Sequence, residues 1–173
     1  MLKTVRKKRT ELIPKKGELN RTEWERAIEL AALRVSKTGA ILILLDADYE
    51  CPKEMAPKMA QLISSIRSDK LKGLVLANTE YESWFVAAIE SLSGKHGLKE
   101  GLEWKNASKN AGKTWIENQM TPGKKYKETV DQLEMTKEFD LQLARSRSDS
   151  FDKFYREMTR LIDTLTKGSN TDA

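Results

Sequence analysis

The sequence is poor in cysteine and histidine. Of its 173 residues, one is a cysteine, Cys51, and one is a histidine, His96. A single cysteine excludes a disulfide within the chain and a zinc site built from cysteines. Serine–histidine or cysteine–histidine catalysis would depend entirely on His96, which lies in the glycine-rich segment 94–97 and is expected to be a solvated turn residue.

Long apolar runs are absent as well. No segment approaches the roughly 20 apolar residues that a helix needs to cross a bilayer, and no signal peptide is visible at the amino end. These absences predict a cytoplasmic protein without a membrane partner. With 39% hydrophobic and 33% charged residues, the chain is expected to form one domain with a true core and a helical extension.

Positive charge is concentrated near the amino end. The formal net charge is +5, and residues 3–16 contain seven lysines or arginines against one acid. Such a cluster can contact phosphates and makes binding depend on salt. We predict that nucleic acid binds here through Arg6, Lys7, Lys8 and Arg9, with an ordinary solvated surface as the alternative.

The most informative segment is Ile-Leu-Ile-Leu-Leu-Asp-Ala-Asp at residues 41–48. Five consecutive branched aliphatic residues predict a strand that is buried on both faces, as in the middle of a parallel sheet. Ligands of open α/β sheets bind at the carboxyl ends of such strands, where Asp46 and Asp48 fall. Two carboxylates that point the same way suit Mg²⁺ or Mn²⁺. The alternative interpretation is that the pair ends the strand and caps the following helix.

Helical and strand patterns alternate over the first half of the chain. Asn20 and Glu23 predict the start of a helix, residues 41–45 and 73–77 predict strands, and Pro52 begins a helix between them. This order predicts an α/β fold with a small, mainly parallel sheet flanked by helices and joined by right-handed crossovers.

The segment after the second strand carries two further acids. Because it lies at the same sheet edge as Asp46 and Asp48, Glu80 or Glu82 can add a third carboxylate to a metal cluster. The competing interpretation is structural, since Thr79 and Glu82 have the spacing of a capping box at the start of a helix.

The chain is expected to consist of four parts. They are an α/β core at 1–92, an insertion at 93–127, a carboxyl-terminal helical part at 128–167 and a flexible tail at 168–173. The insertion is rich in glycine and lysine and contains a helix at about 107–120. The carboxyl-terminal helical part is expected to pack on the core.

Several motifs occur together in a fixed order. They are Leu45-Asp46-Ala47-Asp48 with Cys51-Pro52, Glu80-Tyr81-Glu82-Ser83-Trp84-Phe85, Tyr126, Thr129-Val130-Asp131-Gln132, Ser146-Arg147-Ser148 and Ser150-Phe151-Asp152-Lys153. From about residue 6 to residue 165 the chain resembles the bacterial domain-of-unknown-function family 4276, which is similar to a divergent branch of the Toprim fold. The central Glu-Tyr-Glu-Ser-Trp-Phe motif is the most specific part of this resemblance.

The resemblance implies a Toprim-like, Mg²⁺-dependent phosphodiester site, and hence a nuclease. It implies that Asp46 and Asp48 are metal ligands and catalytic, and that Glu82 is a catalytic residue. It also implies an AAA- or ABC-type ATPase as partner and a role in bacterial antiphage defence. The weaker site candidates that it adds are Asp131, Gln132, Arg147 and Lys153.

One element of the Toprim pattern has no counterpart in this sequence. Toprim-like chains begin with an apolar strand that ends in a catalytic glutamate, whereas Glu11 follows a basic run. The resemblance therefore implies one of three things: a shortened form, a strand supplied by another chain or by a second copy, or lost activity. Nucleotide-sugar glycosyltransferases and haloacid-dehalogenase phosphatases fit less well, because the first need a larger upstream region and the second need Thr or Val where Glu50 stands. The main alternative is a catalytically degenerate Toprim-derived module that binds an ATPase or nucleic acid.

Overall fold

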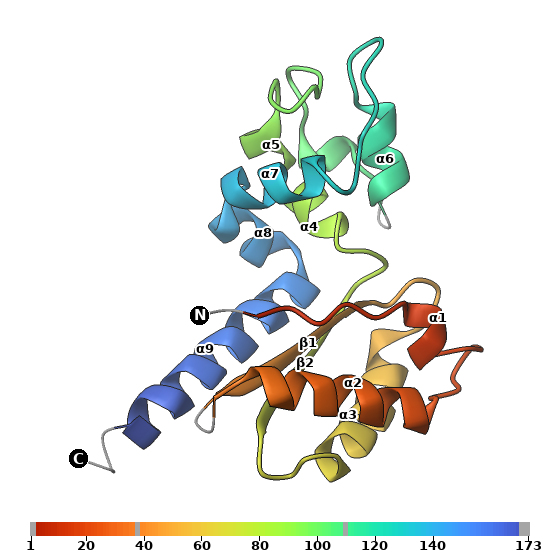
Figure 1. The fold of residues 1–173 in the computed structure, drawn as a ribbon. Coiled ribbons are helices and arrows are strands. Elements are labelled where there is room, and N and C mark those ends of the chain that lie inside the picture. The colour runs from red at the N-terminus through yellow and green to blue at the C-terminus, as the bar shows by residue number, and fades with distance from the viewer. Residues whose placement is uncertain (1–2, 37–38, 109–110, 170–173) are drawn as a thin grey trace. The chain divides into compact units, whose positions relative to one another are not determined.

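The computed structural model describes residues 3–36, 39–108 and 111–169 (Figure 1). Its elements are α1 (Arg9–Leu12), α2 (Arg21–Arg34), β1 (Ala40–Asp46), α3 (Pro52–Ser65), β2 (Leu71–Ala77), α4 (Ser83–Ala87), α5 (Ile89–Leu92), the 3-10 helix η1 (Trp104–Asn106), α6 (Lys113–Asn118), α7 (Asp131–Glu138), α8 (Leu141–Arg147) and α9 (Asp149–Ser169). The fold is mixed α/β, and β1 and β2 form a small parallel sheet flanked by helices. The predicted fold class is confirmed at this level.

The chain divides into two compact units. The first contains the described residues of 1–45, 49–76 and 154–173, and the second those of 46–48 and 77–153. No helix in the described part of the chain is long and apolar enough to cross a membrane.

The helices of the first unit follow their sequence patterns closely. The Asn20 side chain accepts a hydrogen bond from the Glu23 amide at 3.3 Å, which satisfies one of the unpaired N–H groups at the start of α2. The buried residues of α2 are Trp24, Ile28 and Ala32, and those of α3 are Met55, Met59 and Ile63. Residues four apart lie on one helical face, so both helices present an apolar stripe. The predicted helices are confirmed.

The strand β1 differs from the prediction. In the part of the chain that the structure describes, β1 pairs with β2 alone, and within β1 Ile41 is the one buried residue. A strand with one neighbour is an edge strand, and the other aliphatic side chains of β1 are only half-buried. The expectation of a central strand buried on both faces is therefore wrong.

The carboxyl-terminal half of α9 packs beside β2, where Arg160 Nη2 donates to the Lys72 carbonyl at 2.8 Å.

An aromatic cluster forms the core of the second unit. Trp84 and Phe85 of α4 are buried, and their rings meet those of Phe151 and Phe139 edge-on with centroids 5.1 and 5.4 Å apart. Edge-to-face pairs are favourable because the ring edge is positive and the ring face negative. Asp140 then caps α8 by accepting from the amides of Gln142 and Leu143.

Three local predictions for the second unit and the end of the chain are corrected. The capping box of Thr79 and Glu82 is wrong, because α4 begins at Ser83 and the Glu82 side chain makes no capping hydrogen bond. The helix expected at about 107–120 is shorter and spans Lys113–Asn118. The helix α9 continues to Ser169, so the predicted tail begins too early, and residues 170–173 lie outside the described residues.

Candidate functional site

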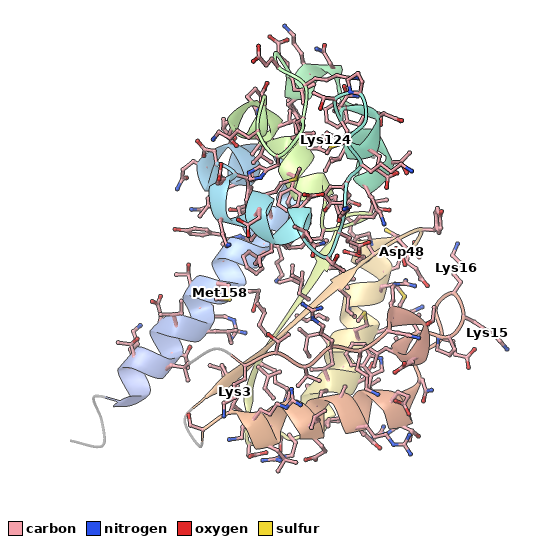
Figure 2. The ribbon with its side chains drawn as sticks, turned by 45° about the horizontal axis from the view of Figure 1, so that its top comes forward. Lys3, Lys15, Lys16, Asp48, Lys124 and Met158 are labelled. Carbon is pink, nitrogen blue, oxygen red and sulfur yellow. The ribbon has the colours of Figure 1, made fainter. Side chains whose placement is uncertain are left out.

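Backbone hydrogen bonds continue past the end of β1 and bring two acidic segments together. The Ala47 amide donates to the Ala77 carbonyl at 2.9 Å, and the Asp48 amide donates to the Thr79 carbonyl at 2.7 Å. Residues 46–48 therefore lie beside residues 77–79, directly before Glu80. Figure 2 labels Asp48 at this place, just after β1.

The backbone at this junction is strained. Asp48 has a φ of 51° and Thr79 a φ of 63°, which places both in the left-handed region. Asp tolerates this region, whereas a β-branched Thr there is an outlier. Such positions cost about 1–3 kcal/mol each and concentrate at functional sites, because the surrounding structure must hold them. The strain favours a functional interpretation of this turn.

Asp46 lies among other acids. Its Oδ1 accepts a hydrogen bond from the Tyr81 amide at 2.8 Å. The pKa of Asp46 is raised to about 6, mainly by burial; the hydrogen bond from Tyr81 opposes this rise, and the nearby charges of Glu82, Asp48 and Glu80 add to it. We call Asp46, Asp48, Glu80 and Glu82 the acidic cluster. The cluster costs energy when fully ionised, and a cation would offset that cost.

The pKa of Asp46 leads to a prediction about stability. The folded protein holds the Asp46 proton more tightly than the unfolded chain, so this stabilisation is present at low pH and is lost as pH rises from about 4 to about 6. Asp46→Asn keeps an oxygen for the Tyr81 amide but carries no charge. In metal-free buffer we expect it to raise the free energy of unfolding at pH 7 by about 1–2 kcal/mol, a value reduced for partial exposure.

Urea unfolding between pH 4 and pH 8 measures this effect, with the exposed Asp163→Asn of α9 as the matched control. The control should leave the pH dependence unchanged. A loss of stability in Asp46→Asn at every pH would contradict this prediction, because it would mean that the ionised carboxylate stabilises the fold more than its burial costs.

Glu82 is the one fully buried charged side chain among the described residues, with 3% of its surface exposed. The hydroxyl of Tyr126 donates to its Oε1 at 2.8 Å, and Nε2 of Gln132 donates to the same atom at 3.1 Å. No described residue donates to Oε2. Burial and the Glu82 carboxylate raise the pKa of Tyr126, so the phenol keeps its proton and remains a donor.

Glu80 is held by the start of α6. Its Oε2 accepts from the Lys113 amide at 2.8 Å. A Cβ at Gly112 would collide with the same oxygen, so the Glu80 carboxylate can keep this position only beside glycine and would have to shift for any other residue. Sequence reasoning missed Gly112 and Lys113, because a single glycine before a short helix carries no specific signal.

The weaker site candidates are dispersed, with one exception. Gln132 contacts Glu82, as described above. The Asp131 carboxylate instead accepts from the Lys127 amide beside the start of α7, and Lys153 is exposed on α9. Arg147 hydrogen-bonds to the Ala87 carbonyl and to Glu90.

The basic segment of the first unit is partly neutralised. Lys7 Nζ lies 2.9 Å from Glu23 and 3.3 Å from Glu11, and Arg9 lies 3.8 Å from Glu50. The other two predicted contacts, Arg6 and Lys8, are exposed. Figure 2 also shows Lys15 and Lys16 extending from the loop between α1 and α2.

The donor chemistry of the acidic cluster fits a hydrated hard cation. Among the described residues, no group of three or more His, Cys, Asp or Glu side chains is arranged to hold a metal ion by itself. Mg²⁺ needs less than that, because it usually keeps several waters and binds through one or two carboxylates and a substrate phosphate. Asp46 and Asp48 supply such a pair.

Comparison of the chain with models of protein families, with curated proteins and with solved structures finds no match in any of the three.

Proposed function

We propose that the acidic cluster binds a hydrated divalent cation, Mg²⁺ or Mn²⁺, and that the second unit hydrolyses phosphodiesters there. The observation that carries the proposal is the environment of Asp46, a half-buried acid with three other carboxylates nearby and a pKa of about 6. Clustered carboxylates repel one another, so the site gains most from a bound cation. The adjoining strain at Asp48 and Thr79 supports a functional role.

Three members of the cluster have a defined part in this proposal. Asp46 and Asp48 would hold the ion. A bound Mg²⁺ neutralises phosphate charge and makes attack by water easier. Glu82 acts as the general base: Tyr126 and Gln132 fix its Oε1, while Oε2 can accept a proton from water.

A non-catalytic module is the alternative, and one observation favours it. The Glu80 carboxylate accepts from the backbone amide of Lys113, and the Glu82 carboxylate accepts from the Tyr126 hydroxyl and the Gln132 side-chain amide. These hydrogen bonds connect the turn after β2 to later parts of the chain. Carboxylates used in this way stabilise the second unit without any chemistry. The ATPase partner, the second copy of the chain and the role in antiphage defence stay predictions from the family resemblance.

Calorimetry with Mn²⁺ tests the proposal. The wild-type protein should give a saturable binding heat that Asp46→Asn with Asp48→Asn abolishes, while the exposed Glu117→Gln of α6 leaves it unchanged. Mg²⁺ should compete for the same site. Equal heats in the wild type and the double variant would leave the structural alternative in place.

The exposed basic residues lead to a separate prediction. Arg6→Gln with Lys8→Gln should weaken binding of single-stranded DNA and reduce the slope of log affinity against log salt by about 1.4, because each lost phosphate contact releases about 0.7 fewer counterions. Fluorescence anisotropy at several salt concentrations measures the slope. Lys7→Gln is the comparison, and its smaller effect is expected from the ion pairs with Glu11 and Glu23. An unchanged slope would identify the segment as a solvated surface.

A further inference from the structure

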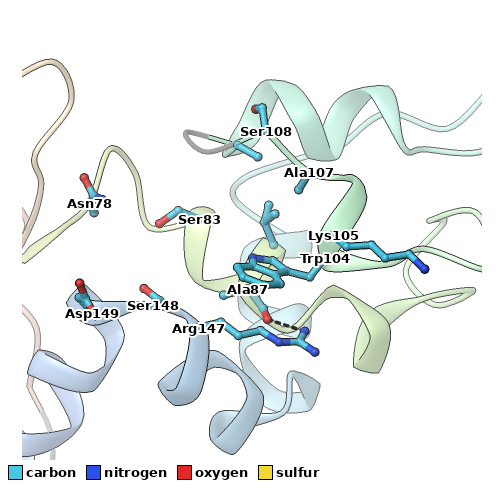
Figure 3. A pocket seen from close by; sticks show the side chains of 12 residues that line it. Asn78, Ser83, Ala87, Trp104, Lys105, Ala107, Ser108, Arg147, Ser148 and Asp149 are labelled. Atoms are coloured by element: carbon cyan, nitrogen blue, oxygen red, sulfur yellow. Dashed lines mark hydrogen bonds between the residues drawn. The ribbon is translucent and has the colours of Figure 1, made fainter.

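A hollow lies within the second unit. It has a volume of about 400 Å³ and is formed by the turn after β2, by α4, by the segment around η1 and by residues where α8 meets α9 (Figure 3). None of the four carboxylates of the acidic cluster is among the described residues that line it. The side chains that line it are therefore distinct from those of the proposed metal site.

Arg147 is held rigidly at this hollow. Its Nη1 donates to the Ala87 carbonyl at 3.1 Å and to the Glu90 carboxylate at 2.7 Å. Its guanidinium carbon lies 5.1 Å from the centroid of the Trp104 ring, which adds a cation–π contact. Because Nη1 makes both hydrogen bonds, the Nε and Nη2 groups have no acceptor among the described residues. That pair of groups has the geometry that binds two oxygens of a phosphate.

Trp104 supplies an aromatic surface beside this arginine. The side chain is large and apolar, yet 42% of it is exposed. Arg147 covers one face of the indole, and the ring also lines the hollow, as Figure 3 shows. An exposed aromatic ring next to a fixed arginine is suited to stacking of a nucleobase.

The remaining lining mixes polar side chains with four apolar ones, Val86, Ala87, Ala107 and Ala111. Asn78 contributes an amide side chain, and Ser108 and Ser148 contribute hydroxyls. The charged residues of the lining are Lys105, Arg147 and Asp149, which sum to one positive charge. A ligand that combines a ring with an acceptor-rich anionic group matches both parts of the hollow.

We propose that this hollow binds one nucleotide unit, with its base on Trp104 and its phosphate on the Nε and Nη2 groups of Arg147. The unit comes either from a free nucleotide or from a single strand, since both present the same base and phosphate. The proposal requires no metal and no activity of the acidic cluster.

Titration in metal-free buffer with EDTA tests this site. The probes are adenosine 5′-monophosphate, adenosine, inorganic phosphate and a single-stranded oligodeoxyadenylate, with binding followed by calorimetry. The monophosphate should bind more tightly than adenosine or phosphate alone. Arg147→Lys keeps the charge but loses the paired donors, so it should weaken binding by about ten-fold, as should Trp104→Ala. Arg145→Lys, on the same helix, is the matched control and should have no effect.

The outcomes separate the possible sources and the two proposals. Tighter binding of the oligonucleotide than of the monophosphate identifies a strand as the ligand, and the reverse identifies a free nucleotide. Asp46→Asn with Asp48→Asn should leave both affinities unchanged, whatever becomes of the metal site. Thermal unfolding checks that Arg147→Lys is folded, and Trp104→Ala provides a second variant at an exposed position. The proposal is overturned by equal affinity for adenosine and its monophosphate, by absence of binding, or by wild-type affinity in both variants.

Discussion

Replacing Glu82 with glutamine should lower Mg²⁺-dependent phosphodiester hydrolysis by about 10²–10⁴-fold, the usual contribution of a general base. Glutamine has the same shape and keeps an oxygen that can accept from Tyr126 and Gln132, so the local structure should persist. The variant cannot take a proton from water, and it also removes one negative charge from the acidic cluster, so the rate is compared at saturating Mg²⁺. Single-turnover cleavage of a labelled oligonucleotide, with protein in excess, measures the rate even where turnover is slow.

Two variants make the Glu82 result interpretable. Glu117→Gln removes an exposed carboxylate from α6 and should leave the rate unchanged. Tyr126→Phe removes one donor to Oε1 and should reduce the rate less than Glu82→Gln does. If Glu82→Gln cleaves as fast as the wild-type protein while Asp46→Asn does not, Glu82 holds the fold and another group acts as the base.

Replacing Trp84 with alanine should lower the free energy of unfolding of the second unit by about 3–5 kcal/mol. Trp84 is 1% exposed, and its ring centroid lies 4.9 Å from that of Tyr81 and 5.1 Å from that of Phe151. Its indole nitrogen also donates to the Ser150 hydroxyl at 2.9 Å. The substitution removes these contacts together and leaves a cavity that the rigid aromatic neighbours cannot fill.

Urea unfolding followed by circular dichroism measures the loss, and the same exchange at the exposed Trp104 is the control. Trp104→Ala should lower the free energy of unfolding by only about 1 kcal/mol, because the ring is 42% exposed and its contact with Arg147 is a cation–π pair near the surface. The Trp84 ring contacts Tyr81, and the Tyr81 amide donates to Asp46. Loss of the Trp84 ring should therefore also weaken Mn²⁺ binding. Equal losses at Trp84 and Trp104 would contradict the aromatic core described here.

The sequence determined the elements whose stability depends on local spacing. The helices α2 and α3 follow from apolar residues four apart and from Asn20 and Pro52 at their starts. The strands β1 and β2 follow from short aliphatic runs that end before polar residues. These signals are local, because a helical or extended backbone fixes which side chains share a face.

The sequence also indicated where the acids gather, but not how each is used. Parallel strands end at one edge of a sheet, so Asp46, Asp48, Glu80 and Glu82 were expected near one another. Their mutual effect on the pKa of Asp46 agrees with this placement. The spacing of Thr79 and Glu82 suggested a capping box. Instead, the Thr79 backbone has a left-handed conformation, and the Glu82 carboxylate accepts a hydrogen bond from Tyr126.

The tertiary structure alone decided the contacts that give these acids their character. Tyr126 and Gln132 reach Glu82 across 44 and 50 residues of chain, and Gly112 admits Glu80 to the Lys113 amide. The pairing of Arg147 with Trp104 spans a similar separation. No periodicity encodes such contacts, because they depend on the path of the intervening chain. Local sequence therefore determined the helices, the strands and the edge where the acids lie, whereas packing over long separations decided which atoms hold each carboxylate.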